Sequence, residues 1–326
     1  MRELWIHHTI ALTLSVILDR VVGDPYSLPH PIRWIGSYIS FLEKKLGKRT
    51  FGTGLFLAIT VMLTTVIITA ALMVVSYKLH PVIGIIMEMI LSCYFLAAKN
   101  LFDESMKVYG SLKNYNLVEA RKNLSMIVGR DTANLDEEKV AKAAVETVAE
   151  NTSDGVIAPL LYMIVGGPVL GALYKSINTM DSMLGYHNEK YEYFGKAAAR
   201  IDDAANFLPS RISALYMIVA AGILQLFTKA YDAKNAFRIW KRDRLAHKSP
   251  NSAQTESVSA GALGLALGGS STYGGKVVEK PVIGDELKKT DAEDIRKVNR
   301  LMFATEDVAV FLFYILSMII ILVTGD

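Results

Sequence analysis

Cysteine and blocks of like charge are scarce in this sequence of 326 residues. Its one cysteine, Cys93, lies in an apolar run, which excludes an intrachain disulfide and a thiolate metal cluster. The 35 basic and 32 acidic residues are interspersed and leave a net charge of only +3, so nucleic-acid binding is not indicated. A cleaved signal peptide is not expected either, because Asp19 and Arg20 stand where a cleavage site needs small residues.

Hydrophobic residues are abundant instead. They make up 52% of the chain, and the mean hydropathy is +0.30, which is typical of a polytopic membrane protein with polar loops. We predict an all-α, polytopic integral membrane protein with broken or re-entrant helices and a single membrane-embedded domain over residues 1–326. The expected main spans are residues 54–77, 82–98, 156–174, 207–227 and 308–323. The polar stretches expected to carry the chemistry are residues 23–36, 129–155, 178–211 and 243–256.

Two predicted spans contain residues that a lipid-facing helix avoids. Glu88 lies within residues 82–98 and is either a functional group or the partner of a donor on a neighbouring helix. Gly166-Gly167-Pro168 interrupts residues 156–174, which predicts a kinked span or a re-entrant pair of half-helices. We favour the re-entrant arrangement, because a full crossing would put residues 175–206 on the opposite side from the other polar stretches.

Three shorter patterns allow further predictions. Residues 10–18 are expected to form a short helix at the membrane, anchored by Trp5. The spacing of Gly264 and Gly268 is typical of helices that pack closely. Basic residues between 229 and 248 indicate a cytoplasmic loop.

The most informative polar stretch surrounds two glutamates. Glu146 and Glu150 are four residues apart, on one face of a helix whose start is predicted by a capping box of Asn134 and Glu137. Like charges at this spacing destabilise a helix by about 0.2–0.5 kcal/mol, so a cation is expected beside them. The oxygen-rich run Asn151-Thr152-Ser153-Asp154 follows and favours a hard ion such as Mg²⁺. An ordinary solvated helix face is the alternative.

A proline-rich segment presents one histidine and one arginine. Pro29 and Pro31 rigidify the backbone around His30 and Arg33, which favours a binding role for both side chains. A capped turn, with Arg33 extending toward lipid headgroups, explains the same pattern.

Aspartates gather in the third polar stretch. Asp202 and Asp203 are neighbours and cannot share one helix face, but either could meet Asp181 in space. Together with Arg200 and Arg211, such a group suits a metal-bridged phosphate. Ordinary ion pairing, with Asn178 as a helix cap, accounts for the stretch equally well.

The fourth stretch precedes a glycine-rich segment. Within the stretch, a helix N-terminus near Ser249 to Ser252 is expected to bind an anion through free backbone N–H groups. Gly269 to Lys276 approaches a phosphate-binding loop, but Ser270 and Val277 break the required spacing, so we reject that motif.

These stretches together resemble one family, the integral-membrane cobalamin biosynthesis proteins CbiB/CobD, adenosylcobinamide-phosphate synthases. The resemblance extends from Gly23-Asp24-Pro25 to Gly274. It is most specific in PHPIRWIG (29–36), GRDT (129–132), ETVAENTSDG (146–155), NTMDSMLGY (178–186), ARIDDAANFLPSR (199–211) and HKSPNS (247–252). One departure concerns the shape of a loop, since Ala253-Gln254-Thr255 stands before Glu256 where a Gly-x-Pro is expected.

The resemblance implies an amide-forming ligase. It would join an aminoalcohol, usually as a phosphate ester such as aminopropanol phosphate or ethanolamine phosphate, to the propionate carboxyl of adenosylcobyric acid. The product would be adenosylcobinamide phosphate, and the reaction is expected to depend on ATP and Mg²⁺. A multi-pass location in the cell membrane follows, with the lipid bilayer and other nucleotide-loop assembly enzymes as partners.

Chemistry suggests roles for individual residues. A carboxylate and an amine do not condense in water without activation, so an acyl phosphate formed from ATP is the economical route. The expected Mg²⁺ ligands are Glu146, Glu150, Asp154, Asp181, Asp202 and Asp203. The expected substrate and phosphate ligands are Arg33, Arg130, Asn178, Arg200, Arg211, Lys248, Ser249 and Asn251. The candidate catalytic residues are His30, His247, Glu146 and Glu150, with either histidine as the base.

Two other functions remain open from the sequence. A membrane prenyl- or phosphotransferase would also place acidic motifs beside membrane helices, but Asp202-Asp203 with Asn206 matches such motifs only in part. A transporter would explain Glu88 and the broken span, although most polar residues lie in loops.

Overall fold

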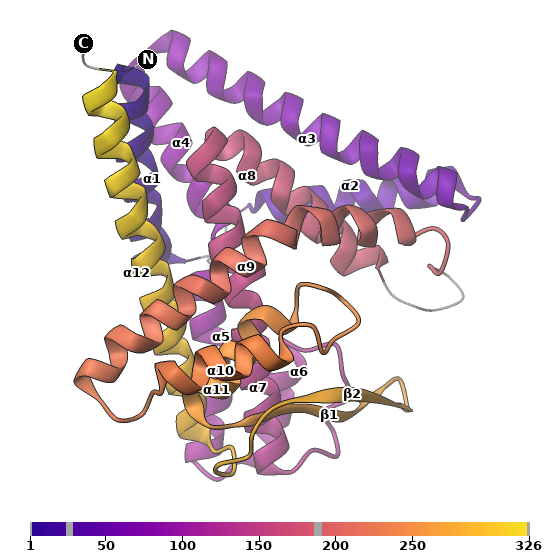
Figure 1. The fold of residues 1–326 in the computed structure, drawn as a ribbon. Coiled ribbons are helices and arrows are strands. Elements are labelled where there is room, and N and C mark those ends of the chain that lie inside the picture. Colours follow the sequence, from indigo (N-terminus) through magenta and orange to yellow (C-terminus); the bar gives the residue numbers. More distant parts are fainter. Residues whose placement is uncertain (1, 24–28, 186–190, 325–326) are drawn as a thin grey trace. The chain divides into compact units, whose positions relative to one another are not determined.

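The computed structural model describes residues 2–23, 29–185 and 191–324, which are mostly helical (Figure 1). The chain divides into two compact units. The first unit contains residues 1–97, 158–206 and 310–326, and the second contains residues 98–157 and 207–309. Two helices, α9 (Lys196–Phe227) and α12 (Ala292–Val323), contribute residues to both. The all-α prediction is confirmed.

The other helices of the first unit are α1 (Arg2–Val22), α2 (Pro31–Leu46), α3 (Phe51–Leu79), α4 (Pro81–Phe95) and α8 (Ala158–Leu184). Across the described part of both units, six helical stretches are long and apolar enough to cross a membrane. They are Arg2–Val22, Phe51–Leu79, Pro81–Lys113, Glu137–Leu184, Lys196–Phe227 and Ala292–Val323. The protein is therefore a multi-pass helical membrane protein.

The N-terminal helix is longer than the sequence suggested. α1 has 21 residues and is itself a candidate membrane span, so the prediction of a short helix over residues 10–18 is wrong. The apolar pattern alone missed its first turns, because Arg2, Glu3 and the two histidines lower the local hydropathy without ending the helix.

α8 is broken at the predicted place. Gly166 and Gly167 leave helical geometry, and Gly167 has φ +58°, a left-handed value that glycine adopts without strain. The rings of Tyr162 and Tyr174 stack with centroids 5.1 Å apart. A straight helix would separate these residues by about 18 Å, so the two arms of α8 fold back on one another (Figure 1). This agrees with the re-entrant pair of half-helices.

The second unit contains α5 (Ala98–Lys113), α6 (Leu117–Ser125), α7 (Glu137–Asn151), the π-helical turn η1 (Thr152–Ile157), α10 (Ala233–Asp243) and α11 (Ala253–Leu263). A buried stripe that includes Val140, Ala144 and Val148 confirms the predicted helix over α7. Its cap differs from the prediction, because Asp136 rather than Asn134 accepts a hydrogen bond, from the Lys139 N–H.

A two-stranded antiparallel hairpin follows α11 in the second unit (Figure 1). It consists of β1 (Ala266–Tyr273) and β2 (Lys276–Gly284). The prediction that Gly264 and Gly268 form a helix-packing pair is wrong. Their φ values of +68° and +81° are left-handed, so Gly264 ends α11 and Gly268 lies at an irregularity in β1.

Candidate functional site

Glu146 lies at the centre of a buried charged cluster in the second unit. Its side chain comes from α7, and the residue is only 4% exposed. Arg130 Nη2 lies 2.6 Å from Glu146 Oε2, and the Gly268 N–H donates to Glu146 Oε1 at 2.6 Å. Burial by itself lowers the pKa of Arg130, yet the ion pair with Glu146 raises it overall. Arg130 therefore carries a permanent positive charge that neutralises Glu146.

The hairpin reaches this cluster through a β-bulge. The register of β1 against β2 shifts between Leu267 and Gly269, which turns the Gly268 N–H away from the strand ladder and toward Glu146. A Cβ at Gly268 would collide with the Pro281 carbonyl, so this position requires glycine. The bulge thus links the hairpin to the carboxylate of α7.

Besides Glu146, two aspartates accept hydrogen bonds from the hairpin, one at its tip and one at its base. Asp131 accepts hydrogen bonds from Gly274 N–H (3.2 Å) and Gly275 N–H (2.8 Å), and Asp243 accepts one from Gly284 N–H (2.8 Å). Three carboxylates therefore bind glycine N–H groups along the length of the hairpin. The rejection of a phosphate-binding loop over Gly269 to Lys276 agrees with this β-turn structure.

His247 and Glu256 form a second pair of the cluster. His247 Nδ1 lies 3.6 Å from Glu256 Oε1 and 3.1 Å from Ser252 Oγ. The other ring nitrogen, Nε2, is buried and has no hydrogen-bond partner within the described part of the chain. Burial, followed by the positive charge of Lys280, lowers the pKa of His247 against an opposite effect of Glu146. His247 is therefore a neutral imidazole at neutral pH, able to accept a proton.

Glu256 and Lys280 complete the cluster with Glu150. Burial, then the negative charges of Glu150 and Glu146, raises the pKa of Glu256 well above its ordinary value. Lys280 and Arg130 oppose this shift. Glu256 ends the predicted polar stretch 243–256 but was not predicted as a ligand or catalytic residue, and Lys280 lies outside every predicted stretch. A signal for Glu256 was available, because it is the lone charged residue among residues 253–263, which are mostly small, and a buried carboxylate there needs a reason.

The predicted oxygen-rich run after Glu150 is a π-helical turn. Asp154 is half-buried within it, and Ser153 Oγ is buried without a hydrogen-bond partner among the described residues. Such turns often mark functional positions in helices. Glu146, Glu150 and Asp154 all belong to the second unit.

The predicted aspartates form a separate group in the first unit. Asp202 on α9 accepts a hydrogen bond from Asn206 at 3.0 Å, and Asn206 accepts one from the Tyr174 hydroxyl at 2.8 Å. The negative charges of Asp181, on the second arm of α8, and of the half-buried Asp203 lie near the Asp202 carboxylate. The side chain of Asn178, also on the second arm, lies near it too. Asn178 lies inside α8, so the alternative that it caps a helix is wrong.

The predicted phosphate ligands are dispersed. In the first unit, Arg33 and Arg200 are exposed on α2 and α9. His30 is buried, accepts a hydrogen bond from the Ile32 N–H as the cap of α2, and packs edge-on against Tyr94. The capped-turn alternative therefore describes the local structure of His30. Asp24, Pro25 and Tyr186, which belong to the stretches that carry the resemblance, lie outside the described residues.

In the second unit, Arg211 organises the loop before α11. Its guanidinium stacks on the Phe207 ring at 3.6 Å and donates to Asn251 Oδ1 at 3.1 Å. Ser249 Oγ accepts the Asn251 N–H at 3.3 Å, whereas Lys248 is exposed. Arg211, Ser249 and Asn251 are thus brought together around the start of α11.

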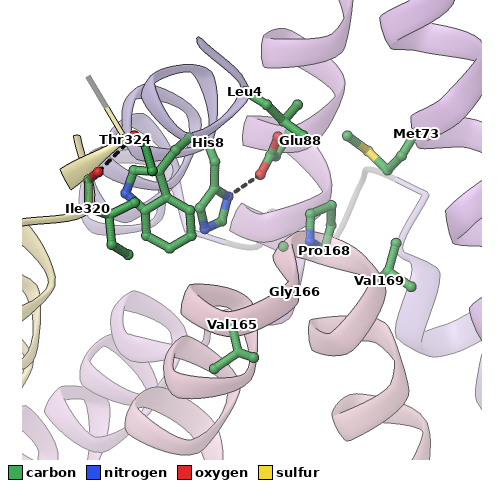
Figure 2. Close-up of a pocket in the computed structure, with 12 residues that line it drawn as sticks. Leu4, His8, Met73, Glu88, Val165, Gly166, Pro168, Val169, Ile320 and Thr324 are labelled. Carbon is green, nitrogen blue, oxygen red and sulfur yellow. Dashed lines mark hydrogen bonds and ion pairs between the residues drawn. The ribbon is translucent and has the colours of Figure 1, made fainter. Parts of the chain in front are cut away.

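A cavity of about 370 Å³ lies at the break of α8 in the first unit (Figure 2). His8 Nδ1 lies 2.5 Å from Glu88 Oε1, and the Tyr77 hydroxyl donates to Glu88 Oε2 at 2.6 Å. Gly167 lies against this pair, since a Cβ there would be 3.2 Å from Glu88 Oε1. Glu88 is therefore the hydrogen-bond partner of side chains on two neighbouring helices, which is one of its two predicted roles.

The fold and these clusters define a class, a multi-pass helical membrane protein with buried acidic, basic and histidine side chains in a unit that carries a β-hairpin. Comparison with known proteins identifies the family. The model of the CobD/Cbib protein family matches residues 12–302, so the chain belongs to this family. No solved structure shows a significant match.

Curated relatives agree with the family assignment. The chain is 45% identical over 307 residues to the "Cobalamin biosynthesis protein CobD" of Streptococcus sanguinis, a match covering 93% of this chain and 96% of the relative. It is 45% identical over 297 residues to the protein of the same name from Clostridium perfringens, covering 90% and 93%. The namesake from Geobacter metallireducens is 46% identical over 310 residues, covering 94% and 96%.

Proposed function

We propose that this protein is an enzyme of cobalamin biosynthesis in the cell membrane, and that it acts as an adenosylcobinamide-phosphate synthase. It would form an amide between adenosylcobyric acid and an aminoalcohol phosphate. Support comes from the shared name of the relatives and from the six sequence stretches that resemble the synthases. The observation that carries the proposal is the buried group of Glu146, Arg130, His247 and Glu256, which unites a fixed cation with a neutral base.

The residues of this group suit the two halves of an amide synthesis. Activation of the corrinoid carboxylate by ATP develops negative charge on phosphate oxygens, which a buried guanidinium such as Arg130 stabilises. The incoming ammonium must lose a proton before its nitrogen can attack, and the neutral His247 imidazole can accept that proton. His30 suits this task less well, because its Nδ1 already caps α2.

Mg²⁺ is the expected counter-ion of ATP, and among the predicted ligands of the first unit Asp181 and Asp202 supply the carboxylate oxygens that suit it. No three His, Cys, Asp or Glu side chains of the described residues are grouped as a preformed metal site. Mg²⁺ nevertheless often binds one or two carboxylates and completes its coordination with water and phosphate oxygens. Asp202 Oδ1 is buried without a hydrogen-bond partner among the described residues, and Asp181 acts on the same carboxylate.

The remaining predicted ligands have specific constraints. Both oxygens of Glu146 are already bound, so a metal role there would require breaking its contacts with Arg130 and Gly268. Glu150, Asp154 and Asp203 stay candidates for orienting metal-bound water.

The test is product formation by the purified full chain in lipid nanodiscs. Adenosylcobyric acid, aminopropanol phosphate, ATP and Mg²⁺ should give adenosylcobinamide phosphate, measured by mass spectrometry, with nucleotide release only when both acceptor substrates are present. Glu150→Gln and Asp202→Asn should each lower the rate by about 100-fold or more, as expected for lost electrostatic stabilisation of a transition state. Product formed at the wild-type rate by Asp202→Asn would contradict the metal assignment, and no product with any aminoalcohol would contradict the function.

A further inference from the structure

α10 starts where the candidate membrane span α9 ends (Figure 1). The N–H of Ala233, the first residue of α10, donates to Gln225 Oε1 in the last turn of α9 at 3.0 Å. A Cβ added at Gly222 on α9 would lie 3.7 Å from the Ala233 Cβ. Leu226 and Phe227, at the end of α9, are 81% and 83% exposed, so this last turn presents apolar surface to lipid. The start of α10 therefore lies at the boundary where α9 leaves the membrane.

The inner face of α10 is fixed against α11. Ala236, Ile239 and Trp240 are buried on this face. Asn235 Nδ2 donates to the Gly261 carbonyl of α11 at 2.7 Å. A Cβ added at Gly261 would come within 2.7 Å of the Asn235 carbonyl oxygen, so the two helices are in close contact. The opposite face of α10 is consequently the one that is turned outward.

The outer face of α10 carries two lysines without an anionic partner. Lys234 and Lys241 are about two turns apart, which places them on one side of the helix, and both are exposed. Neither lysine forms an ion pair with residues 2–23, 29–185 or 191–324. Arg238, which lies between them, is paired with Asp285, and the same carboxylate accepts Arg242 Nη1 at 2.7 Å. The positive charge that remains on this face is therefore that of the lysines.

An aromatic side chain accompanies the lysines. Phe237 follows Lys234 by three residues, on the same side of α10, and is 49% exposed. Together with Lys241, Arg238 and Arg242, these residues line a hollow of about 700 Å³. Exposed lysines beside an exposed aromatic ring are typical of helices that lie in the headgroup region of a membrane. In such helices the ammonium groups contact phosphates and the ring reaches the acyl boundary.

The chemistry of this face favours a phospholipid surface over a free phosphate ion. Lys234 and Lys241 are about 10 Å apart along the helix, so they suit neighbouring headgroups better than one small anion. A free phosphate would also leave the Phe237 ring in water, whereas a phospholipid brings an apolar region next to its phosphate. Lysine is a compact point charge without the bidentate geometry of arginine, and such charges suit a mobile headgroup layer.

We propose that the outer face of α10 docks on the headgroup layer of the membrane and binds anionic phospholipids. Lys234 and Lys241 contact the phosphodiester groups, and Phe237 reaches the acyl boundary. Because α10 is fixed to α11, which carries Glu256, docking also holds this part of the second unit at the membrane surface. The inference is independent of the proposed reaction, since none of the three docking residues belongs to the buried charged cluster.

The experiment is native mass spectrometry of the detergent-solubilised full chain, titrated with phosphatidylglycerol, phosphatidylcholine or inorganic phosphate. Wild type should bind the first phosphatidylglycerol about tenfold or more tightly than the first phosphatidylcholine. The double variant Lys234→Gln with Lys241→Gln should bind phosphatidylglycerol about 25-fold more weakly than wild type, since each basic residue at an anionic surface contributes a factor of about five. Its phosphatidylcholine binding should not change.

Two further sets of variants serve as controls. Lys122→Gln with Lys276→Gln removes two exposed lysines elsewhere in the second unit and should bind phosphatidylglycerol like wild type. The single variants Lys234→Gln and Lys241→Gln should each show about a fivefold loss, so the test does not depend on the folding of the double variant. Thermal unfolding without added lipid should be the same for all these variants, because every substituted lysine is exposed.

Three results would overturn the inference. The first is equal affinity for phosphatidylglycerol in wild type and in the Lys234 and Lys241 variants. The second is displacement of phosphatidylglycerol from wild type by an equal concentration of inorganic phosphate, because the face would then recognise a free anion. The third is no preference of wild type for phosphatidylglycerol over phosphatidylcholine, which would leave the face to a protein partner.

Discussion

The Arg130–Glu146 pair shows how a charge is tolerated inside the second unit. Neither partner is open to water, so each depends on the other for charge compensation. Removing one member of such a pair leaves an uncompensated buried charge, which is far more destabilising than replacing both. This pair therefore stabilises the arrangement in which the hairpin meets α7.

We expect Arg130→Met to lower the free energy of unfolding by about 3–5 kcal/mol, because Glu146 loses its cation. The double variant Arg130→Met with Glu146→Gln should be clearly more stable than the single one, since no charge is then left alone. Thermal unfolding in one detergent measures the difference, and Lys241→Met, an exposed change, is the control. Equal melting temperatures for the single and double variants would contradict the argument.

The pH dependence of activity should report on His247. In the proposed reaction its neutral form accepts the proton, so the rate should fall as pH drops through the pKa of His247. Burial and the charge of Lys280 lower this pKa, while Glu146 raises it and Glu256 lies against the ring. Lys280→Met removes one lowering cause, so the acid limb of kcat/KM should move to higher pH. An acid limb that stays in place, or moves to lower pH, would show that His247 is not the group that titrates.

Among the helices and strands, the features correctly predicted from the sequence are those that neighbouring residues determine. Gly166-Gly167-Pro168 breaks α8, because Pro168 lacks an N–H and Gly167 adopts a left-handed backbone. The helix over α7 followed from its apolar spacing. The hairpin was missed, because small residues such as Gly268 suit close helix packing as well as a bulge, and only the partner strand decides between them.

Gly167 is the position of α8 where a side chain should be least tolerated. Gly167→Ala would force alanine to φ +58° and place its Cβ 3.2 Å from Glu88 Oε1. We expect a loss of about 1–3 kcal/mol from the backbone strain. Gly110→Ala, inside α5 with nothing within 4 Å of the added Cβ, should instead be neutral or slightly stabilising. Thermal unfolding compares the two variants, and equal stabilities would contradict a requirement for glycine at the break.

At the scale of the whole molecule, the sequence could not tell which acidic residues share a unit. Glu150 and Asp181 are 31 positions apart, yet they belong to different compact units, whereas Glu146 and Gly268 are 122 positions apart and bind each other. Such pairings depend on which distant segments of the chain pack into the same unit, and the spacing of residues along the sequence does not predict this. The single Mg²⁺ site that includes Asp154 and Asp202 therefore stays a prediction.

Membrane orientation is a whole-molecule property that the basic residues predict. The segment after α9 carries Lys229, Lys234, Arg238, Lys241, Arg242, Arg244 and Lys248. An excess of Lys and Arg marks the cytoplasmic side, so this segment should face the cytoplasm. In a Cys93→Ala background, Lys241→Cys should react with a membrane-impermeant maleimide in inside-out vesicles and not in intact cells.

The same labelling tests the re-entrant arrangement of α8. Ser182 is exposed on the second arm, within the predicted polar segment 175–206. Because the two arms of α8 fold back at Gly166 and Gly167, the second arm is expected to return to the side from which α8 enters. Ser182→Cys should therefore be labelled from the same side as Lys139→Cys, an exposed position at the start of α7, from which the chain enters α8. The Cys93→Ala parent gives the background, since it contains no cysteine and should not react from either side. Labelling of Ser182→Cys and Lys139→Cys from opposite sides would mean that α8 crosses the membrane despite its break.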